Sequence, residues 1–265
     1  MNIRKAVIPA AGLGRRFLPI TKVIPKPMLP IVDRPTLHYL VDEAKRSGIE
    51  QIAIIVGYGR HLIQTYFADD AQVTLLDQPE PRGSGHAVLM ARSFVGDEPF
   101  AVLLGDIVID SDPPCTRQLI DLYQQLKSPV LAVETLKYDL LSKHNAIAYQ
   151  KIDEKRLLIH HIVEKPSRDV PSTIAAIGRY IFPPEIFSVL AETPPGLNGE
   201  IQLTDAINGL LEKHRGFGLF YTGKRYDIGD KRDYVMANLE FALKSQDYRD
   251  DLLLSLGKLT YSPRK

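Results

Sequence analysis

Short apolar runs of strand length alternate with longer stretches of helical pattern along residues 1–140. The runs that predict strands lie at 5–10, 51–56, 73–76, 100–104 and 130–135, and the stretches that predict helices lie at 37–47, 60–67, 85–93 and 116–127. Strands and helices that alternate at this spacing indicate an α/β fold, with an open, mostly parallel, Rossmann-like sheet flanked by helices. The run from Ala101 to Leu104 is entirely apolar, which is typical of a strand buried on both faces of such a sheet.

The pattern changes after about residue 140. Strand-like runs at 146–152, 157–163 and 174–182 follow with less helix between them, and helical stretches come at 184–191, 202–214 and 231–244. The three strands either add to the edge of the sheet or form a small subdomain. Since no linker or repeat interrupts the chain, we expect one continuous domain over 1–245, with a peripheral helix and a tail over 246–265.

The composition is that of a globular protein with balanced charge. Of 265 residues, 33 are lysine or arginine and 32 are aspartate or glutamate, so the formal net charge is +1. No overall positive field would attract nucleic acid, and any binding of phosphate has to come from local clusters. The lone Cys115 predicts a small buried hydrophobic residue rather than a nucleophile. The N-terminal apolar stretch is too short for a membrane span or a signal peptide, so we expect a cytoplasmic protein without membrane partners.

A glycine-rich turn follows the first predicted strand, at 10–17 (AAGLGRRF). It is not a dinucleotide-binding fingerprint, because Phe17 stands where the third glycine is needed. Prolines at 19, 25, 27 and 30 also exclude the regular helix that would hold a pyrophosphate at its N-terminus. The turn and the loop after it carry four basic residues: Arg15, Arg16, Lys22 and Lys26. Backbone N–H groups and cations on a proline-stiffened loop at the end of a strand favour a polyphosphate ligand.

Several motifs, taken in their order along the chain, resemble those of the sugar nucleotidyltransferases. The motifs are 11–16 (AGLGRR) with 26–30 (KPMLP), Gln78 with 83–88 (GSGHAV), 104–106 (LGD), 163–166 (VEKP), 199–207 (GEIQLTDAI) and 226–229 (YDIG). The last two are similar to segments of the bacterial uridylyltransferases within that family. The resemblance extends over residues 3–245, and it implies a nucleotide-binding half at about 1–140 and a sugar-binding half at about 141–229.

This resemblance implies a reaction, and it implies a role for each residue that matches a motif. The reaction would be transfer of UMP from UTP to glucose 1-phosphate, with pyrophosphate released and Mg²⁺ as cofactor. The implied catalytic residues are Arg16, Lys26, Asp106 and Lys165. The implied nucleotide-binding residues are Ala11, Gly12, Gly14, Gln78 and Gly83, the sugar-binding residues Glu164, Gly178 and Glu200, and the metal ligands Asp106 and Asp227. Carboxylates are the protein ligands that Mg²⁺ prefers.

Glu164 and Lys165 are neighbours, and neighbours on a strand point to opposite faces. We therefore expect them at the end of a strand, before Pro166, where both can face one ligand. Thr204 and Asp205 are expected to cap a helix that begins near Ala206, and Asp230 to cap the helix after Gly229. Asp110 and Asp112 are expected to be ordinary turn residues, and His86, His160 and His161 to be structural or surface residues.

Two departures from the family pattern leave alternatives open. Pro27 stands where the uridylyltransferases usually carry glutamate, which favours thymidylyl or another nucleotidyl transfer to a hexose 1-phosphate, whereas 199–207 favours UTP. The stretch 57–77 has no room for the family's usual helical insertion. The resemblance therefore does not imply the family's usual oligomer, although a homo-oligomer is possible. A non-catalytic regulator that binds nucleotide sugars is a further alternative, because a fold does not fix a function.

Overall fold

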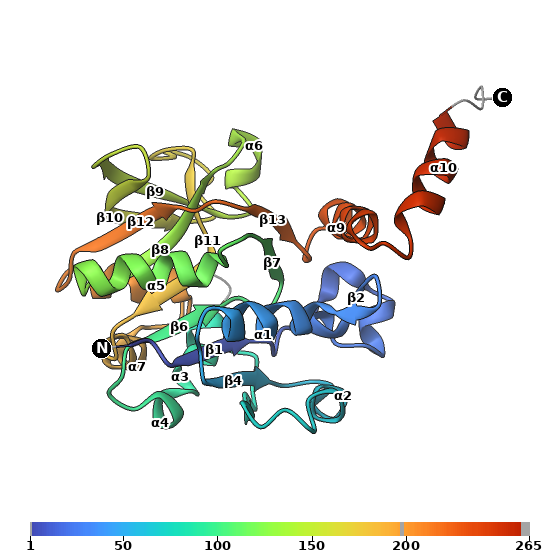
Figure 1. Ribbon diagram of the computed structural model, residues 1–265. Helices are drawn as coiled ribbons and strands as arrows, with labels where there is room; N and C mark the ends of the chain where they lie inside the picture. The colour runs from blue at the N-terminus through green and yellow to red at the C-terminus, as the bar shows by residue number, and fades with distance from the viewer. Residues whose placement is uncertain (1, 197–198, 261–265) are drawn as a thin grey trace.

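The computed structural model describes residues 2–196 and 199–260, and over these ranges nine strands form one sheet (Figure 1). In spatial order they are β5 (Val73–Asp77), β4 (Gln51–Val56), β1 (Lys5–Pro9), β6 (Phe100–Leu103), β11 (Ile174–Phe182), β8 (Val130–Thr135), β12 (Gly216–Phe220), β10 (Arg156–Glu164) and β9 (Asn145–Lys151). The strands from β5 to β6 run parallel, whereas β11 is antiparallel to both of its neighbours. The predicted α/β fold with an open, mixed sheet is confirmed.

The three strands that were predicted after residue 140 belong to this same sheet. β11 lies at its centre, between β6 and β8, and β12 runs parallel to β8. β10 and β9 pair in antiparallel fashion at the edge. The part of the chain before residue 140 and the part after it are therefore joined where β6 pairs with β11.

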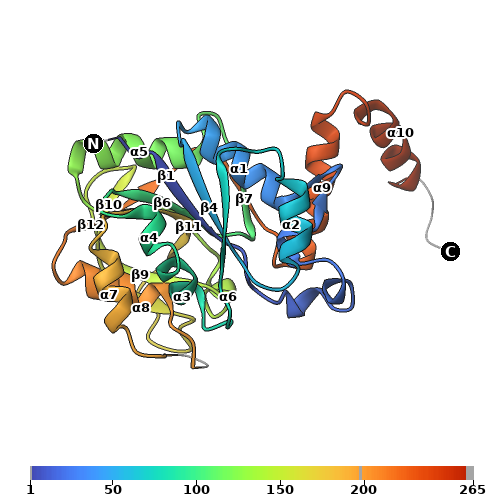
Figure 2. The ribbon, with the colours of Figure 1, turned by 90° about the horizontal axis from the view of Figure 1, so that it is seen from below.

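Helices cover both faces of the sheet, as Figure 2 shows. One face packs against α1 (Thr36–Arg46) and α5 (Cys115–Leu126), and the other against α3 (Ser84–Leu89), α7 (Ile186–Glu192) and α8 (Leu203–Leu211). Neighbouring residues of β1 belong to different cores, since Ile8 is buried with the first set of helices and Val7 with the second. A strand buried on both sides is apolar at most positions, which explains why apolar runs predicted these strands.

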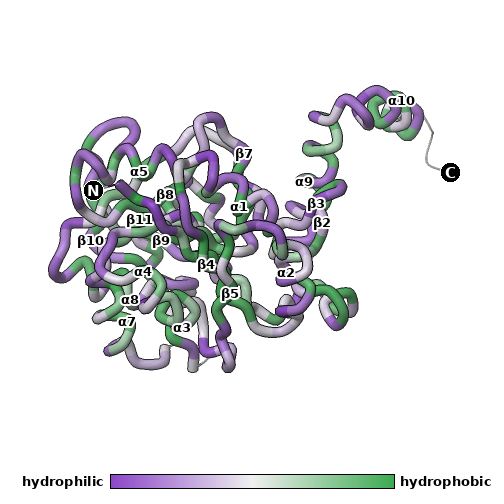
Figure 3. The backbone as a smooth tube through the Cα atoms, turned by 60° about the horizontal axis from the view of Figure 1, so that its bottom comes forward, coloured by the Kyte–Doolittle hydropathy of each residue, from purple (hydrophilic) through white to green (hydrophobic). Residues whose placement is uncertain are grey.

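The remaining elements are short or peripheral. α9 (Lys231–Lys244) packs on β13 (Lys224–Asp227) and β2 (Pro30–Ile31), and α10 (Arg249–Thr260) contacts α9 and projects from the body (Figure 1). Two small ribbons form, β13 with β7 (Ile107–Asp110) and β2 with β3 (Arg34–Pro35), and the other helices are α2 (Arg60–Tyr66), α4 (Arg92–Val95) and α6 (Tyr138–Leu141). Figure 3, in which the chain is coloured by residue hydropathy, shows hydrophobic residues along central strands such as β4. Within the described ranges, no helix has the length and apolarity that a membrane crossing requires.

Predicted and observed elements agree best where a strand is fully buried. β4, β8 and β11 have the predicted bounds, and so does α9. The single helix predicted over 85–93 is wrong, because α3 ends at Leu89 and α4 begins at Arg92. The proline-rich loop contains three turns of 3₁₀ helix instead of an α-helix: η1 (Arg15–Phe17), η2 (Ile20–Lys22) and η3 (Lys26–Met28). This agrees with the expectation that its prolines exclude a regular helix.

Candidate active site

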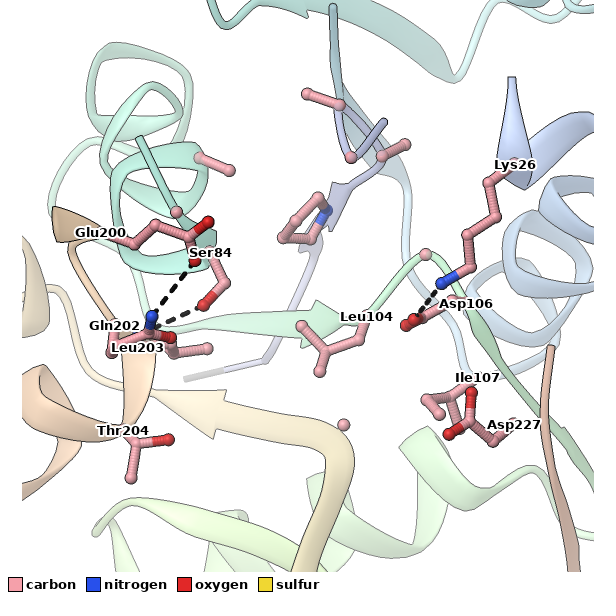
Figure 4. Close-up of a pocket in the computed structure, with 18 of the residues that line it drawn as sticks. Lys26, Ser84, Leu104, Asp106, Ile107, Glu200, Gln202, Leu203, Thr204 and Asp227 are labelled. Atoms are coloured by element: carbon pink, nitrogen blue, oxygen red, sulfur yellow. Dashed lines mark hydrogen bonds and ion pairs between the residues drawn. The ribbon is translucent and has the colours of Figure 1, made fainter. Parts of the chain in front are cut away.

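One pocket of about 590 Å³ brings together all of the site residues that the sequence predicted. It opens at the carboxyl ends of β1 and β6, which is where open α/β sheets place their ligands. Figure 4 shows the pocket with Lys26 and Asp106 on one side and Glu200 and Thr204 on the other. Its predicted lining residues are Ala11, Gly12, Gly14, Arg16, Lys26, Gln78, Gly83, Asp106, Glu164, Lys165, Gly178, Glu200 and Asp227.

The glycine-rich turn folds back onto the loop that carries Lys26. Gly14 has a φ of +60°, and a Cβ there would lie 2.9 Å from Cβ of Lys26. The Thr21 hydroxyl donates to the Gly14 carbonyl at 2.9 Å, which fixes the turn against η2. Gly14 is therefore needed both for its left-handed backbone and for the close approach of Lys26.

Lys26 and Asp106 form an ion pair inside the pocket (Figure 4). Asp106 follows β6, and the turn that carries it is tied to β1 by a hydrogen bond from Gly105 N to Pro9 O, 3.1 Å. Lost hydration opposes ionisation of Asp106, but the Lys26 ammonium, with help from Arg16, holds the pKa of this carboxyl below its usual range. Asp106 is therefore an ionised oxygen donor, and Lys26 a cation already directed at the pocket.

Asp227 lies at the end of β13, beside the Asp106 turn. The N–H of Ile228 donates to Asp106 O at 2.8 Å, and Oδ1 of Asp227 accepts from Gly229 N at 2.7 Å. Burial, and then the negative charge of Asp106, raise the pKa of Asp227 above its ordinary value. Two carboxylates that repel each other across a pocket form the hard oxygen donor set that suits Mg²⁺, with phosphate oxygens as further ligands.

Glu164 and Lys165 lie at the end of β10 and both line the pocket, as predicted. Lys165 has a φ of +44°, which turns the chain so that these neighbours no longer face opposite sides. Lys165 Nζ lies 3.7 Å from Glu164 Oε1. Thr204 donates its hydroxyl to Glu164 Oε2 at 2.7 Å, so its predicted role as a helix cap is wrong. α8 begins at Leu203, without a side-chain cap from Thr204 or Asp205.

Gln78 and Gly83, two of the predicted nucleotide-binding residues, meet on the Glu200 side of the pocket, across from Lys26 and Asp106. Gln78 is almost fully buried, and its amide nitrogen donates to Gly83 O at 3.1 Å and lies 2.9 Å from Nδ1 of His86. Gly83 has a φ of +103°, and a Cβ there would lie 2.6 Å from Ile201 O. The amide nitrogen is thus used within the protein, which leaves the Gln78 carbonyl oxygen as the atom for a ligand.

Gly178 lies in β11, where the pairing of β11 with β8 is irregular. Its φ is +85°, and a Cβ there would lie 3.1 Å from Cβ of Leu104. A side chain at this position would press on the segment before Asp106. The glycine therefore lets β11 approach the segment that carries Asp106 closely.

Several lining residues were not predicted from the sequence. They are Lys143, His144, Asn145, Tyr180 and Arg225. Asn145 bonds through its side chain to both backbone groups of Ala176, at 2.8 and 3.0 Å, and so replaces strand pairing where β11 is irregular. His144 Nε2 lies 4.0 Å from Asp227 Oδ2. For Lys143, His144 and Asn145, the signal in the sequence was that they form a polar stretch directly before the strand predicted at 146–152.

Residues predicted to be structural mostly are. Cys115 is fully buried, and burial raises the pKa of its thiol well above the ordinary value. Asp230 caps α9, because its side chain accepts from the N–H groups of Arg232 and Asp233. The turn position predicted for Asp110 is wrong, since this residue ends β7 and forms an ion pair with Lys244.

Comparison with known proteins places this site in a class. A family model described as nucleotidyl transferase matches residues 5–244, so the chain belongs to the nucleotidyl transferase family. The UTP–glucose-1-phosphate uridylyltransferase of Bacillus subtilis (strain 168) is 42% identical over an alignment of 278 positions, which covers 95% of this chain and 95% of that enzyme. The predicted enzyme class, a nucleotidyltransferase, is confirmed.

Solved structures give the same result. A UDP-glucose pyrophosphorylase complexed with UDP-glucose superposes with a TM-score of 0.88 at 38% identity, covering 92% of this chain and 100% of that one. The UTP-bound UGPase from Acinetobacter baumannii superposes with a TM-score of 0.84 at 31% identity, covering 99% of this chain and 100% of that one. A homo-oligomer and a cytoplasmic location stay predictions.

Proposed function

We propose that this chain transfers UMP from UTP to glucose 1-phosphate, with Mg²⁺ as cofactor, to give UDP-glucose and pyrophosphate. The observation that carries the proposal is that a single pocket gathers the Lys26–Asp106 pair, the buried Gln78 amide and a second cation, Lys165, in its lining. The bacterial relative that is named for this activity, and the solved relatives that bind UTP and UDP-glucose, support the choice of substrates.

The reaction needs alignment and charge, and it needs no enzyme nucleophile. An oxygen of the sugar phosphate attacks the α-phosphorus of UTP, and the bond from that phosphorus to the pyrophosphate oxygen breaks. Lys26 is the cation for the reacting phosphate, and Arg16 is the cation for the departing pyrophosphate. Both line the pocket, and cations held in place by the fold stabilise charge that develops in the transition state.

Asp106 and Asp227 would hold Mg²⁺ together with substrate phosphate oxygens. When bound, the ion would offset negative charge on the reacting phosphates. The carboxylates suit this role because both face the pocket and Asp106 raises the pKa of Asp227. Lys165 would neutralise the sugar phosphate, which otherwise repels the triphosphate that it attacks.

Base recognition would use an edge that only some bases offer. Uracil and thymine both present N3–H between two carbonyl oxygens, and the Gln78 carbonyl would accept a hydrogen bond from N3–H. Adenine lacks this donor, so its ring would leave buried polar groups unpaired, whereas the thymine methyl group changes the fit by only about 1–3 kcal/mol. Gln78→Ala should lower kcat/KM for UTP and leave the KM for glucose 1-phosphate nearly unchanged.

Pyrophosphate release measured over several nucleoside triphosphates and sugar 1-phosphates tests the proposal. UTP with glucose 1-phosphate should be the fastest pair, and dTTP the nearest competitor. A faster rate with dTTP would mean that Pro27 is the better guide to specificity. Tight binding of UDP-glucose without any turnover would instead identify a regulator.

A further inference from the structure

An arginine is completely buried behind the active site. Arg179 follows Gly178 in β11 and has 0% of its surface exposed. Its guanidinium forms an ion pair with Glu43 of α1, with Nη2 2.8 Å from Oε2 and Nε 3.0 and 3.1 Å from the two carboxylate oxygens. Buried ion pairs are rarely more stabilising than apolar residues of the same volume. Stability alone therefore does not account for this pair.

The same guanidinium holds two backbone carbonyls that border the pocket. Nη2 donates to Ile107 O at 2.8 Å, and Nη1 donates to Gly178 O at 3.1 Å. Gly178 O also accepts from Leu104 N at 2.9 Å. Ile107 and Leu104 lie at the two ends of the turn that carries Asp106. Arg179 thus fixes this turn against β11 at both ends, from the side that faces away from the ligand.

Glu43 connects this arrangement to the loop that carries Lys26. Its Oε1 accepts from the backbone N–H and the hydroxyl of Thr116 at 3.1 and 2.7 Å, which orients the carboxylate toward Arg179. α1, which carries Glu43, begins at Thr36, whose N–H and hydroxyl donate to Leu29 O at 2.9 and 2.8 Å. Leu29 directly follows η3, the 3₁₀ turn that starts with Lys26. One rigid helix therefore links the Lys26 loop to the Asp106 turn.

We propose that Arg179 and Glu43 are positioning residues for nucleotidyl transfer. Neither residue lines the pocket itself, and they act through lining residues by holding Asp106 opposite Lys26. This inference rests on the proposed function, because that function supplies the reaction whose rate is measured. Displacement of a reacting group by about 1 Å can cost about 100-fold in rate, so a device of this kind has a large effect without contacting substrate.

Lysine cannot replace arginine in this role. The guanidinium is a planar fork whose nitrogens reach Glu43, Ile107 O and Gly178 O at the same time. A lysine ammonium keeps the charge but has its donors at a single point. Arg179→Lys therefore keeps the positive charge and removes the simultaneous hydrogen bonds to Ile107 O and Gly178 O.

The experiment compares two variants with wild type and with a matched control. The variants are Arg179→Lys and the double change Arg179→Met with Glu43→Leu, which removes both charges. The control is Lys45→Met with Asp70→Asn, because Lys45 lies on the same helix and pairs with Asp70 at 2.6 Å, away from the pocket. Readouts are circular dichroism and Tm, the Kd for UDP-glucose by calorimetry, and kcat and KM for both substrates at a temperature well below every Tm.

Both variants should fold and keep KM and the UDP-glucose Kd within about threefold, while kcat falls by about ten- to 100-fold. The control should keep the wild-type kcat. A folded Arg179→Lys enzyme with the wild-type kcat would overturn the proposal, and so would loss of the fold in both variants, which would assign the pair to stability. If only the double variant fails to fold, the kcat of the Arg179→Lys enzyme decides whether the proposal holds.

The outcome for the proposed function is read separately, from wild type alone. Wild type is first assayed against several nucleotides and sugar phosphates, and the variants are then compared with it on the pair that it uses. A wild type that prefers another nucleotide would refute the proposed function. The ratio of variant to wild-type kcat would still decide the positioning role.

Discussion

The ammonium group of Lys26 and the carboxylate of Asp106 form an ion pair between residues that lie 80 positions apart in the chain. Lys26 comes from a loop stiffened by prolines, and Asp106 from the turn after a buried strand. The ion pair therefore fixes the position of the Lys26 charge, and a fixed charge is the condition for strong stabilisation of a transition state. We expect the reacting phosphate to bind beside this pair.

Lys26→Ala should lower kcat by about 100- to 1000-fold, because it removes a preorganised charged donor at the reacting phosphate. The KM for glucose 1-phosphate should change little, since Lys165 is the cation for the sugar phosphate. Steady-state kinetics with both substrates measures this. Lys22→Ala, on the same loop but outside the pocket, is the control and should behave as wild type. An effect of Lys26→Ala on the sugar KM alone would contradict the assignment.

Removal of divalent cations should abolish activity. Excess chelator should stop pyrophosphate release, and added Mg²⁺ should restore it, because the two pocket carboxylates need an ion to offset the negative phosphates. Asp106→Asn should lower turnover by orders of magnitude with the fold intact, whereas Asp112→Asn, at an exposed position, should not. Full turnover in chelator would refute the metal role.

Asp227→Asn should make the protein more resistant to heat when no metal is present. Burial and Asp106 raise the pKa of Asp227, so at neutral pH its ionised form is less favourable in the folded state than in the unfolded state. Asparagine removes that cost and can still accept from Gly229 N through its Oδ1. Thermal unfolding in chelator at pH 7 should give a higher Tm for the variant, and the difference should shrink as the pH falls through the raised pKa of Asp227 toward the ordinary aspartate value of 3.8. A lower Tm for the variant at pH 7 would count against this account of Asp227.

Lys165→Ala should raise the KM for glucose 1-phosphate far more than it lowers kcat. Thr204→Val should do the same to a smaller degree, because it removes the hydroxyl that orients Glu164 at 2.7 Å. Kinetics with glucose 1-phosphate varied at saturating UTP measures both, and Lys155→Ala at the surface is the control. If Thr204→Val has no effect on this KM, the Thr204–Glu164 bond does not shape the sugar site.

A fully buried strand such as β6 could be predicted from the sequence because burial on both faces favours an uninterrupted apolar run. The β13–β7 ribbon could not, since Asp227 pairs with Ile107 over a long separation and each strand is short. The predicted site residues meet in one pocket because their motifs follow strand ends. Residues that reach the pocket through strand order alone, such as Asn145 and Arg225, left little local signal.

Thr204 and Arg179 show where local patterns mislead. A threonine before a helical stretch is typical of an N-cap, yet the hydroxyl of Thr204 bonds to Glu164, which lies 40 positions earlier. Arg179 stands in an apolar run and carries no motif, but its partners come from α1 and from the Asp106 turn. Contacts between distant segments decide both roles, and only the folded chain brings these segments together.

A competition experiment tests the central claim most directly. Equal amounts of UTP, dTTP, CTP, ATP and GTP are incubated with the protein, Mg²⁺ and glucose 1-phosphate, and the nucleotide sugars formed are identified by mass spectrometry. We predict that UDP-glucose forms first and in the largest amount, followed by dTDP-glucose. ADP-glucose or GDP-glucose as the main product would contradict the account of the base site, and the absence of any nucleotide sugar would contradict the proposed enzyme.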